Sequence, residues 1–309
     1  MGVALAALVG VMVPPATAAP GSATYKVGCG KAKLLRISFT KAARNTKTVI
    51  ILNPNKKASC VYELPSATTG ASTNLTSRAE GVVVQGNGAT IKPRTRSKYG
   101  ATIQVTEGSL TLRDVTVESN GDASVHVRDM RDTENGQGTF GTLILAGTSV
   151  LSGPGQTGAS VDGTMEMRDQ SRVTGFPNGG VSNTGTFTMS GNSRVSGNSN
   201  VSGPYGGGGV FNRGTMTMKE SAAVSGNSAK KDSDVRGGLG GGIFNDREGH
   251  LTVQGHATVS DNRADPAGEA NGQGGGIYNM GNATVAPGSI RQNTPTQCAG
   301  PQPVTGCTG

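Results

Sequence analysis

Ionisable side chains gather between residues 121 and 140, and they have the types that acid–base chemistry on a polymer requires. The candidates for a catalytic role are His126, Arg128, Asp129 and Asp132. Glycoside hydrolysis uses two carboxylates at a fixed separation, and a lyase uses a basic side chain beside carboxylate-bound Ca²⁺. A solvated loop of mixed charge has the same composition. We therefore expect no catalytic machinery, and Ca²⁺ is an expected cofactor only if the protein is a lyase.

Two further sets of residues recur at repeat spacing and have the chemistry of ligand-binding groups. Phe211, Phe244 and Tyr278 recur in three similar segments, and Arg172 and Arg194 occupy equivalent places in adjacent units. Outward-facing rings would fit the faces of sugars, whereas rings stacked on one another would stabilise the fold. The arginines fit an anion, although stacked bases also occur on solvated faces. All five are candidate ligand-binding residues.

No other set of residues has the spacing of a nucleophilic, metal-binding or phosphate-binding site. The three histidines are dispersed, and no Cys-x-x-Cys pair is present. The glycines lie in strand–turn repeats rather than before a helix, which excludes a phosphate-binding loop. We predict no metal ligands and no other cofactor.

A repeat must position these candidates, and its shortest period, between Gly141, Gly163 and Gly185, is 22 residues. Apolar residues alternate with polar ones, mainly threonine, which is typical of a strand with one buried face. Two columns of inward side chains are expected: Leu143, Met165, Phe187, Met216 and Leu251, and Leu145, Met167, Met189, Met218 and Val253. Three short strands per unit predict an all-β parallel β-helix of about nine or ten coils, in which each strand pairs with its copy one coil later.

The composition agrees with a narrow solenoid. Glycine accounts for 50 of 309 residues, tryptophan is absent and aromatic residues are 4 % of the chain. No Gly-X-Y period and no apolar run of about 18 residues is present, which argues against collagen and a membrane-spanning helix. We expect one elongated monomeric domain.

Asparagines recur at two positions of the repeat. The first column contains Asn183, Asn212, Asn245 and Asn279, and the second contains Asn198, Asn227, Asn262 and Asn293. Asparagine tolerates the left-handed conformation, and stacked copies can hydrogen-bond from coil to coil. We interpret both columns as structural ladders. Insertions are expected at residues 121–140, 228–240 and 263–273, where a repeat protein often builds its binding face.

The two ends differ from the repeat. Residues 20–60 hold nine basic and no acidic residues, although the whole chain has a net charge of only +8. Residues 31–44 place apolar side chains on one helical face and predict an amphipathic cap helix. We assign residues 20–60 to a basic cap, residues 61–293 to the β-helix and residues 294–309 to a C-terminal tail.

The four cysteines lie near the two ends, at Cys29, Cys60, Cys298 and Cys307. An even number in an exported chain predicts disulfides, with three possible connectivities. We favour Cys29–Cys60 and Cys298–Cys307, because the ends of a long stack lie too far apart for cross-pairing.

The amino-terminal residues suggest export. An apolar stretch from Val3 to Val13 is followed by the small-x-small pattern of Ala16 and Ala18. This is typical of a signal peptide over residues 1–19, although no basic residue precedes the apolar stretch. The alternatives are a first strand or a lipid-surface anchor.

The repeats GGGIFN with DREGHLTVQGHATVSDN, and GGGIYN with MGNATVAPGSIRQN, resemble those of secreted bacterial parallel β-helix proteins of the pectin-lyase-like superfamily. They are also similar to repeats of polymorphic outer-membrane proteins, except that Asn here follows the aromatic residue directly. The resemblance implies a right-handed coil, the hand that parallel crossovers favour. The Asn-Thr-Asp, Asp-Asp, Gly-His-Gly and Arg-x-Lys motifs of the superfamily's polygalacturonases are missing.

These observations predict a secreted, non-catalytic protein associated with the cell surface or cell wall. The expected partner is an anionic cell-wall or extracellular polysaccharide, and nucleic acid is not expected. The alternatives are a polysaccharide lyase or glycoside hydrolase, and an adhesin-like passenger.

Overall fold

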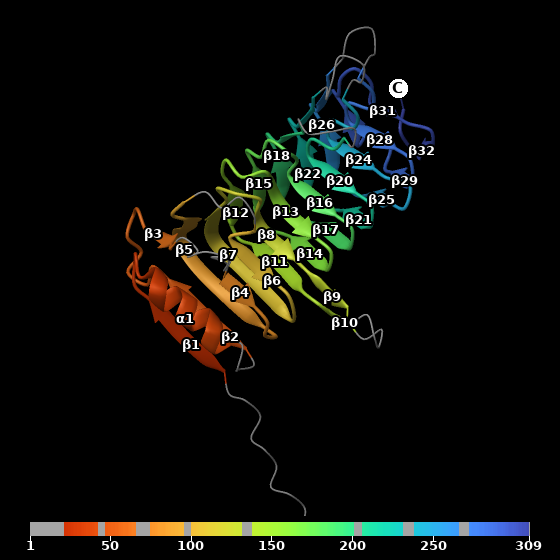
Figure 1. Cartoon of the computed structure of the whole chain (residues 1–309). Helices are drawn as coiled ribbons and strands as arrows, with labels where there is room; N and C mark the ends of the chain where they lie inside the picture. The colour runs from red at the N-terminus through yellow and green to blue at the C-terminus, as the bar shows by residue number, and fades with distance from the viewer. Residues whose placement is uncertain are drawn as a thin grey trace, which may run out of the picture.

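The computed structural model describes residues 22–42, 47–65, 75–95, 100–131, 138–200, 206–230, 238–265 and 272–308. Within these ranges the regular secondary structure is all β-strand except for one α-helix, α1 (Ala32–Ala42). The strands stack along one axis from the helix toward the C-terminus, as the colour gradient in Figure 1 shows. The architecture is therefore a parallel β-solenoid. The expected signal peptide, residues 1–19, lies outside the described residues.

The strands form three faces, and successive members of each face pair in parallel. Face 1 consists of β1 (Ala23–Val27), β2 (Thr48–Leu52), the first parts of β5 (Val82–Pro93) and β7 (Ser109–Glu118), β11 (Thr142–Ala146), β14 (Thr164–Met167), β17 (Thr186–Met189), β21 (Thr215–Met218), β25 (His250–Val253), β29 (Asn282–Val285) and β32 (Val304–Thr305). Face 2 consists of β3 (Val61–Leu64), the later parts of β5 and β7, β12 (Val150–Ser152), β15 (Arg172–Thr174), β18 (Arg194–Ser196), β22 (Ala223–Ser225), β26 (Thr258–Ser260) and β30 (Ile290–Arg291). Face 3 consists of β4 (Leu75–Ser77), β6 (Ile103–Val105), β8 (Ala123–Val127), β13 (Thr157–Val161), β16 (Val181–Asn183), β20 (Val210–Asn212), β24 (Ile243–Asn245), β28 (Ile277–Asn279) and β31 (Cys298–Ala299).

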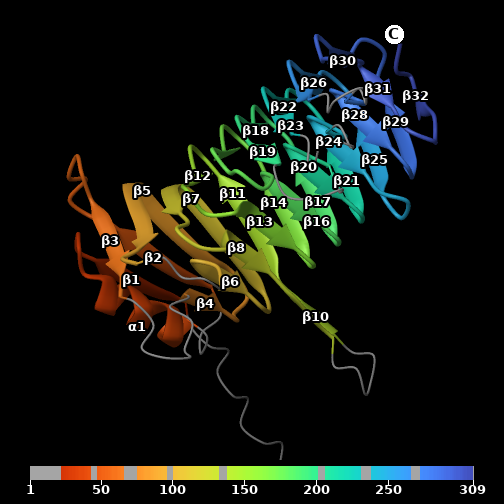
Figure 2. The ribbon, with the colours of Figure 1, turned by 45° about the horizontal axis from the view of Figure 1, so that its top comes forward.

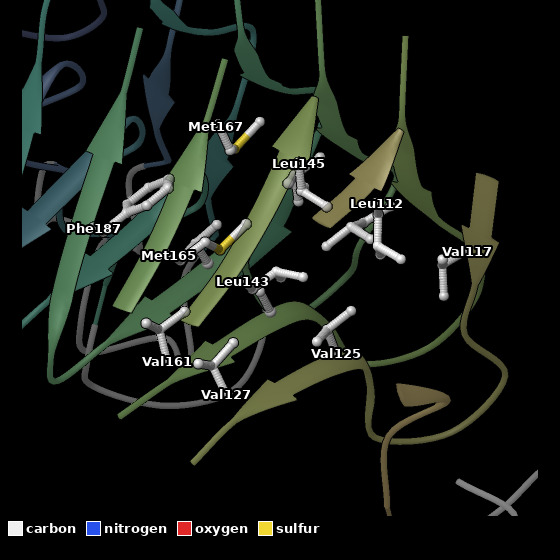
Figure 3. Close-up of a cluster of buried hydrophobic side chains, with 14 of the residues drawn as sticks. Leu112, Val117, Val125, Val127, Leu143, Leu145, Val161, Met165, Met167 and Phe187 are labelled. Atoms are coloured by element: carbon white, nitrogen blue, oxygen red, sulfur yellow. The ribbon is translucent and has the colours of Figure 1, made fainter. Parts of the chain in front are cut away.

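The alternating pattern places one set of side chains inside the coils. Met165 lies opposite Leu143 and Phe187, and Met189 lies opposite Met167 and Met218, as the repeat predicts. Figure 3 shows inward side chains of all three faces meeting in one interior, among them Leu143, Leu145, Met165, Met167, Val125, Val127, Val161 and Val117. Each of these is at most 1 % exposed, so they form a continuous apolar core.

Both asparagine columns lie inside the corners and hydrogen-bond from coil to coil. In the first column, Asn183 Nδ2 donates to Asn212 Oδ1 at 2.7 Å, and Asn212 Nδ2 donates to Asn245 Oδ1 at 2.7 Å. The second column repeats this bond at 3.0 to 3.1 Å from Asn198 through Asn293. In that column the side-chain oxygens of Asn227, Asn262 and Asn293 also accept the backbone N–H of the preceding asparagine. Buried polar groups require such partners, so these columns stabilise the turns.

A further corner, between faces 1 and 2, places one residue per coil at positive φ. Glycine alternates there with acidic residues: Gly147 and Gly191 with Asp114, Asp169 and Glu220. The carboxylates accept backbone N–H groups of the neighbouring coil, as Asp169 does from Gly147 at 2.7 Å and Glu220 does from Gly191 at 2.8 Å. Burial raises the pKa of Asp114, but hydrogen bonds from Thr148 and Gln85 outweigh it, so the pKa lies below its usual range.

The two disulfides join Cys29 to Cys60 and Cys298 to Cys307. Helix α1 buries Leu35, Ser38, Phe39 and Ala42 against the first strands of the solenoid. The parallel strand pairing continues into both terminal segments, since β1 and β2 join face 1 and β31 joins face 3. No helix among the described residues has the length and apolarity needed to cross a bilayer.

The expected insertions contain regular structure. Residues 123–127 are strand β8 of face 3, so the interpretation of 121–140 as an insertion is wrong there. Its later part forms an antiparallel hairpin of β9 (Asp129–Arg131) and β10 (Gly138–Phe140), and β10 projects from the solenoid in Figure 2. The other two insertions begin with β23 (Ser228–Ala229) and β27 (Arg263–Ala264), which extend a small parallel sheet from β19 (Ser199–Asn200).

Candidate functional site

One outward-facing column on face 3 contains candidates that the sequence presents as two separate groups. The strand register aligns Gln104, His126, Ser160, Ser182, Phe211, Phe244 and Tyr278 along this face. The neighbouring residues on each strand point inward, so period-2 geometry turns these side chains outward. His126 therefore lies three strands from Phe211, a separation of about 14 Å. The strands of this face run side by side in Figure 1.

The three aromatic rings stack on one another along the column. The ring centroids of Phe211 and Phe244 are 5.6 Å apart, and those of Phe244 and Tyr278 are 5.4 Å apart. Phe244 is only 2 % exposed, and the backbone of Gly206 and Leu239 lies over this region. The middle ring therefore contributes to stability, while Phe211 and Tyr278 remain half-buried at the two ends of the stack.

A groove of about 490 Å³ begins at the N-terminal end of this stack. Its lining includes Ser182 and Phe211 on face 3, Asn178 and Asn200 beside it, and Arg213 at the corner that leads to face 1. The combination of one aromatic ring, two carboxamides and a guanidinium is both apolar and rich in hydrogen-bonding groups. Such lining is suited to a ligand with hydroxyl groups and an apolar face.

Arg213 is fixed in place by two neighbours. Its Nε and Nη2 atoms each lie 2.9 Å from Oδ2 of Asp246, whose side chain is largely buried. Its guanidinium carbon lies 6.0 Å from the centroid of Phe211. An ion pair to a largely buried carboxylate and a ring contact both restrict the arginine, so it is preorganised at the rim of the groove.

Arg213, Asp246, Asn178 and Asn200 are not among the residues that the sequence predicts for a site. The first two follow the inward asparagine of their repeats, at a position that holds Thr184 in an earlier unit. The residue type at this position varies from unit to unit but is mostly polar. That polarity is the sequence signal that could have marked it as a candidate site position. Asn178 and Asn200 lie outside the regular part of the repeat, and only the folded chain brings them together through a β-bridge.

His126 occupies the same outer column but is largely buried, with 8 % of its surface exposed. Arg128 Nη2 donates to Nδ1 at 3.2 Å, and Nε2 lies 3.4 Å from Oδ2 of Asp122. Since Arg128 can only donate, Nδ1 is unprotonated and the neutral ring carries its proton on Nε2. Burial and then the charge of Arg128 lower the pKa of His126, although Asp122 and Asp162 oppose the shift.

Of the other catalytic candidates, Arg128 contacts His126, whereas no described contact joins Asp129 or Asp132 to it. Asp129 belongs to β9, whose side chains are outside the described structure, and Asp132 lies outside the described residues altogether. Within the described part of the chain, no three His, Cys, Asp or Glu side chains are grouped so as to hold a metal ion.

Arg172 and Arg194 lie on a different face from the aromatic column. They are opposite one another on β15 and β18 of face 2, and both are exposed. The structure therefore does not join the five predicted ligand-binding residues into one site. A second groove, of about 460 Å³, lies beside the N-terminal ends of the face 1 strands β14, β17, β21 and β25, and its lining includes Phe140, Asp162 and His250.

Comparison of this chain with protein-family models, curated proteins and solved structures finds no match.

Proposed function

We propose that this is a secreted, non-catalytic protein that binds an extracellular or cell-wall polysaccharide along face 3. The groove beside Phe211 and Arg213 is the observation that carries this proposal. Its aromatic ring can lie against the apolar face of a sugar, while Arg213, Asn178 and Asn200 provide hydrogen-bonding groups at its edges. An anionic polysaccharide fits best, because the arginine can share its guanidinium between Asp246 and a uronate or phosphate.

The proposed scaffold is a right-handed β-helix of the pectin-lyase-like type, with about nine or ten coils. Parallel pairing of strands in consecutive coils supports it, and right-handed crossovers are the general rule for parallel strands. In this scheme α1 caps the N-terminal end, which its burial against the first strands supports. The two disulfides are compatible with export.

The groove can be tested by measuring Kd for a panel of uronate-containing and neutral polysaccharides. Arg213→Gln removes the guanidinium, and Ser182→Trp would fill the groove with a larger side chain. Each variant is expected to weaken binding at least about tenfold. Arg172→Gln on face 2 is the matched control and should leave Kd unchanged. Thermal unfolding of each variant establishes that the fold is retained. Equal binding by all four proteins, or binding by none, would contradict the proposal.

A lyase is the second candidate, and the position of His126 on the same face, with Nε2 3.4 Å from Oδ2 of Asp122, is the observation that favours it. Histidine is the side chain that most often acts as a general base, and here this role requires Arg128 to release Nδ1. Incubation with uronate polymers, with and without Ca²⁺, would be followed by the ultraviolet absorbance of unsaturated products. Turnover that is lost in His126→Gln would establish the lyase and overturn the non-catalytic assignment, whereas no turnover with any polymer supports binding alone.

A further inference from the structure

Helix α1 has one buried face and one face of unusual composition exposed to solvent. The buried face packs on β1, β3 and β4, which leaves Leu34 and Ile37 on the outside. Leu34 is 50 % exposed and Ile37 is 39 % exposed. Among the described residues only one other large apolar side chain, Phe140, has comparable exposure. Because Leu34 and Ile37 are three residues apart, they are neighbours on the helix surface.

Basic side chains surround this apolar pair. Lys33, Arg36 and Lys41 lie on α1, Lys31 directly precedes it, and all four are exposed. Lys26, Lys47, Lys56 and Lys57 add exposed positive charge within the same terminal segment. The first acidic residue after residue 20 is Glu63, which pairs with Lys92 at 3.3 Å. The outer face of α1 therefore carries several basic side chains around its apolar pair, and residues 20–60 contain no acidic residue.

The combination of aliphatic and basic side chains identifies the partner by its chemistry. A hydrated polyanion would pair with the lysines but gain little from exposed leucine and isoleucine. An anionic bilayer offers phosphate headgroups to the bases and acyl chains to the aliphatic side chains. We propose that the outer face of α1 docks on an anionic phospholipid surface.

The scaffold suits such a contact because α1 is held rigidly. Cys29 before the helix is bonded to Cys60, and Tyr62 Oη donates to the carbonyl oxygen of Val27 at 2.6 Å. The helix lies at the end of the solenoid opposite the C-terminus, as Figure 1 shows. Docking through α1 would therefore leave the groove beside Phe211 away from the lipid contact. This inference does not depend on the proposed polysaccharide binding.

Co-sedimentation of the folded protein with vesicles tests the inference. The vesicles contain either phosphatidylcholine alone or equal parts of phosphatidylcholine and phosphatidylglycerol. We expect binding only to the anionic vesicles, weakened about thirtyfold by the double variant Lys33→Gln and Arg36→Gln. The double variant Leu34→Ser and Ile37→Ser should weaken it at least about tenfold.

Matched controls change the same residue types elsewhere. Phe140→Ser removes the other exposed apolar side chain, and Arg172→Gln with Arg194→Gln removes two exposed bases from face 2; both variants should bind as the unchanged protein does. Dextran sulfate is the soluble polyanion for comparison. One result would overturn the lipid assignment in favour of a polyanion. In it, Lys33→Gln with Arg36→Gln loses vesicle binding, Leu34→Ser with Ile37→Ser keeps it, and the unchanged protein binds dextran sulfate tightly. Vesicle binding unchanged in both double variants would overturn it entirely, and so would no vesicle binding at all.

Discussion

The two halves of the solenoid form their corners in different ways. In residues 22–152, β5 is 12 residues long and β7 is 10 residues long, and both run through the corner between faces 1 and 2. In residues 153–308 every described strand has five residues or fewer. There the corner between faces 1 and 2 turns at residues with positive φ, such as Asp169 and Gly191. Buried asparagine columns and the glycine runs 206–209, 240–242 and 274–276 form the other corners. The comparison indicates that sharp corners require either a side-chain partner for the turning backbone or the absence of a side chain.

The glycine runs illustrate the second device. A Cβ atom on Gly209 would lie 2.7 Å from the carbonyl oxygen of Gly242, and one on Gly242 would lie 2.7 Å from that of Gly276. These contacts are closer than ordinary Cβ packing allows, so adjacent coils approach through their backbones. The inward asparagines lie beside these glycines, and the corner depends on both residue types together.

The largest expected effect concerns the disulfide at each end. Replacing Cys29 and Cys60 by serine should lower the free energy of unfolding by about 4 kcal/mol, because the bond closes a long loop. Replacing Cys298 and Cys307, whose separation is 9 residues, should lower it by about 3 kcal/mol. Equilibrium unfolding in urea measures both. A larger loss at the C-terminal end would contradict this ranking.

Breaking an asparagine column is the next test, and it is specific to the C-terminal half. Asn212→Ala should cost about 3 kcal/mol, because it removes two coil-to-coil bonds and leaves buried polar atoms of Asn183 and Asn245 without those partners. The matched control is Asn192→Ala at an exposed position, which should cost less than about 0.5 kcal/mol. Equal costs in urea unfolding would remove the structural role of the column.

The smallest effect is a pH dependence that arises from His126. Because its folded pKa lies below the unfolded value of about 6.5, the unfolded chain binds more protons in that window. Stability from this group is therefore present above about pH 6.5 and is lost as the pH falls toward the folded pKa. The difference in thermal midpoint between about pH 8 and about pH 5 should be smaller in His126→Gln. An unchanged difference would show that the histidine is not held neutral in the fold.

The regular part of the fold could be predicted because its repeats align the same residue types. Met165, Met189, Asn212 and Asn245 occupy the predicted interior columns, and the cysteines pair as favoured. The repeat signal is weaker before Gly141, so the sequence wrongly assigns β8 to an insertion. In the chain before Gly141, aliphatic residues and long strands stand where later coils have the asparagines and glycines that identify corners in the sequence.

The candidate site was only partly predictable. The repeat alignment detected Phe211, Phe244 and Tyr278 as one column, but only the covering backbone near Gly206 shows that Phe244 is buried. The place of His126 in the same column depends on strand register across coils of unequal length. Arg172 and Arg194 stack on adjacent coils, as their equivalent places in the repeat predict, but their strands lie on another face than the rings.

The central claim is that each coil of face 3 lies in register on the next, and engineered disulfides test it most directly. Ser160 and Ser182 are opposite one another on β13 and β16, and both side chains are partly exposed. Adjacent strands are about 4.8 Å apart, so Ser160→Cys with Ser182→Cys should form a disulfide under mild oxidation. Ser160→Cys with Thr184→Cys, displaced by two residues, should not. Cross-linking of the displaced pair in preference to the aligned pair would contradict the register, and with it the column that unites the site.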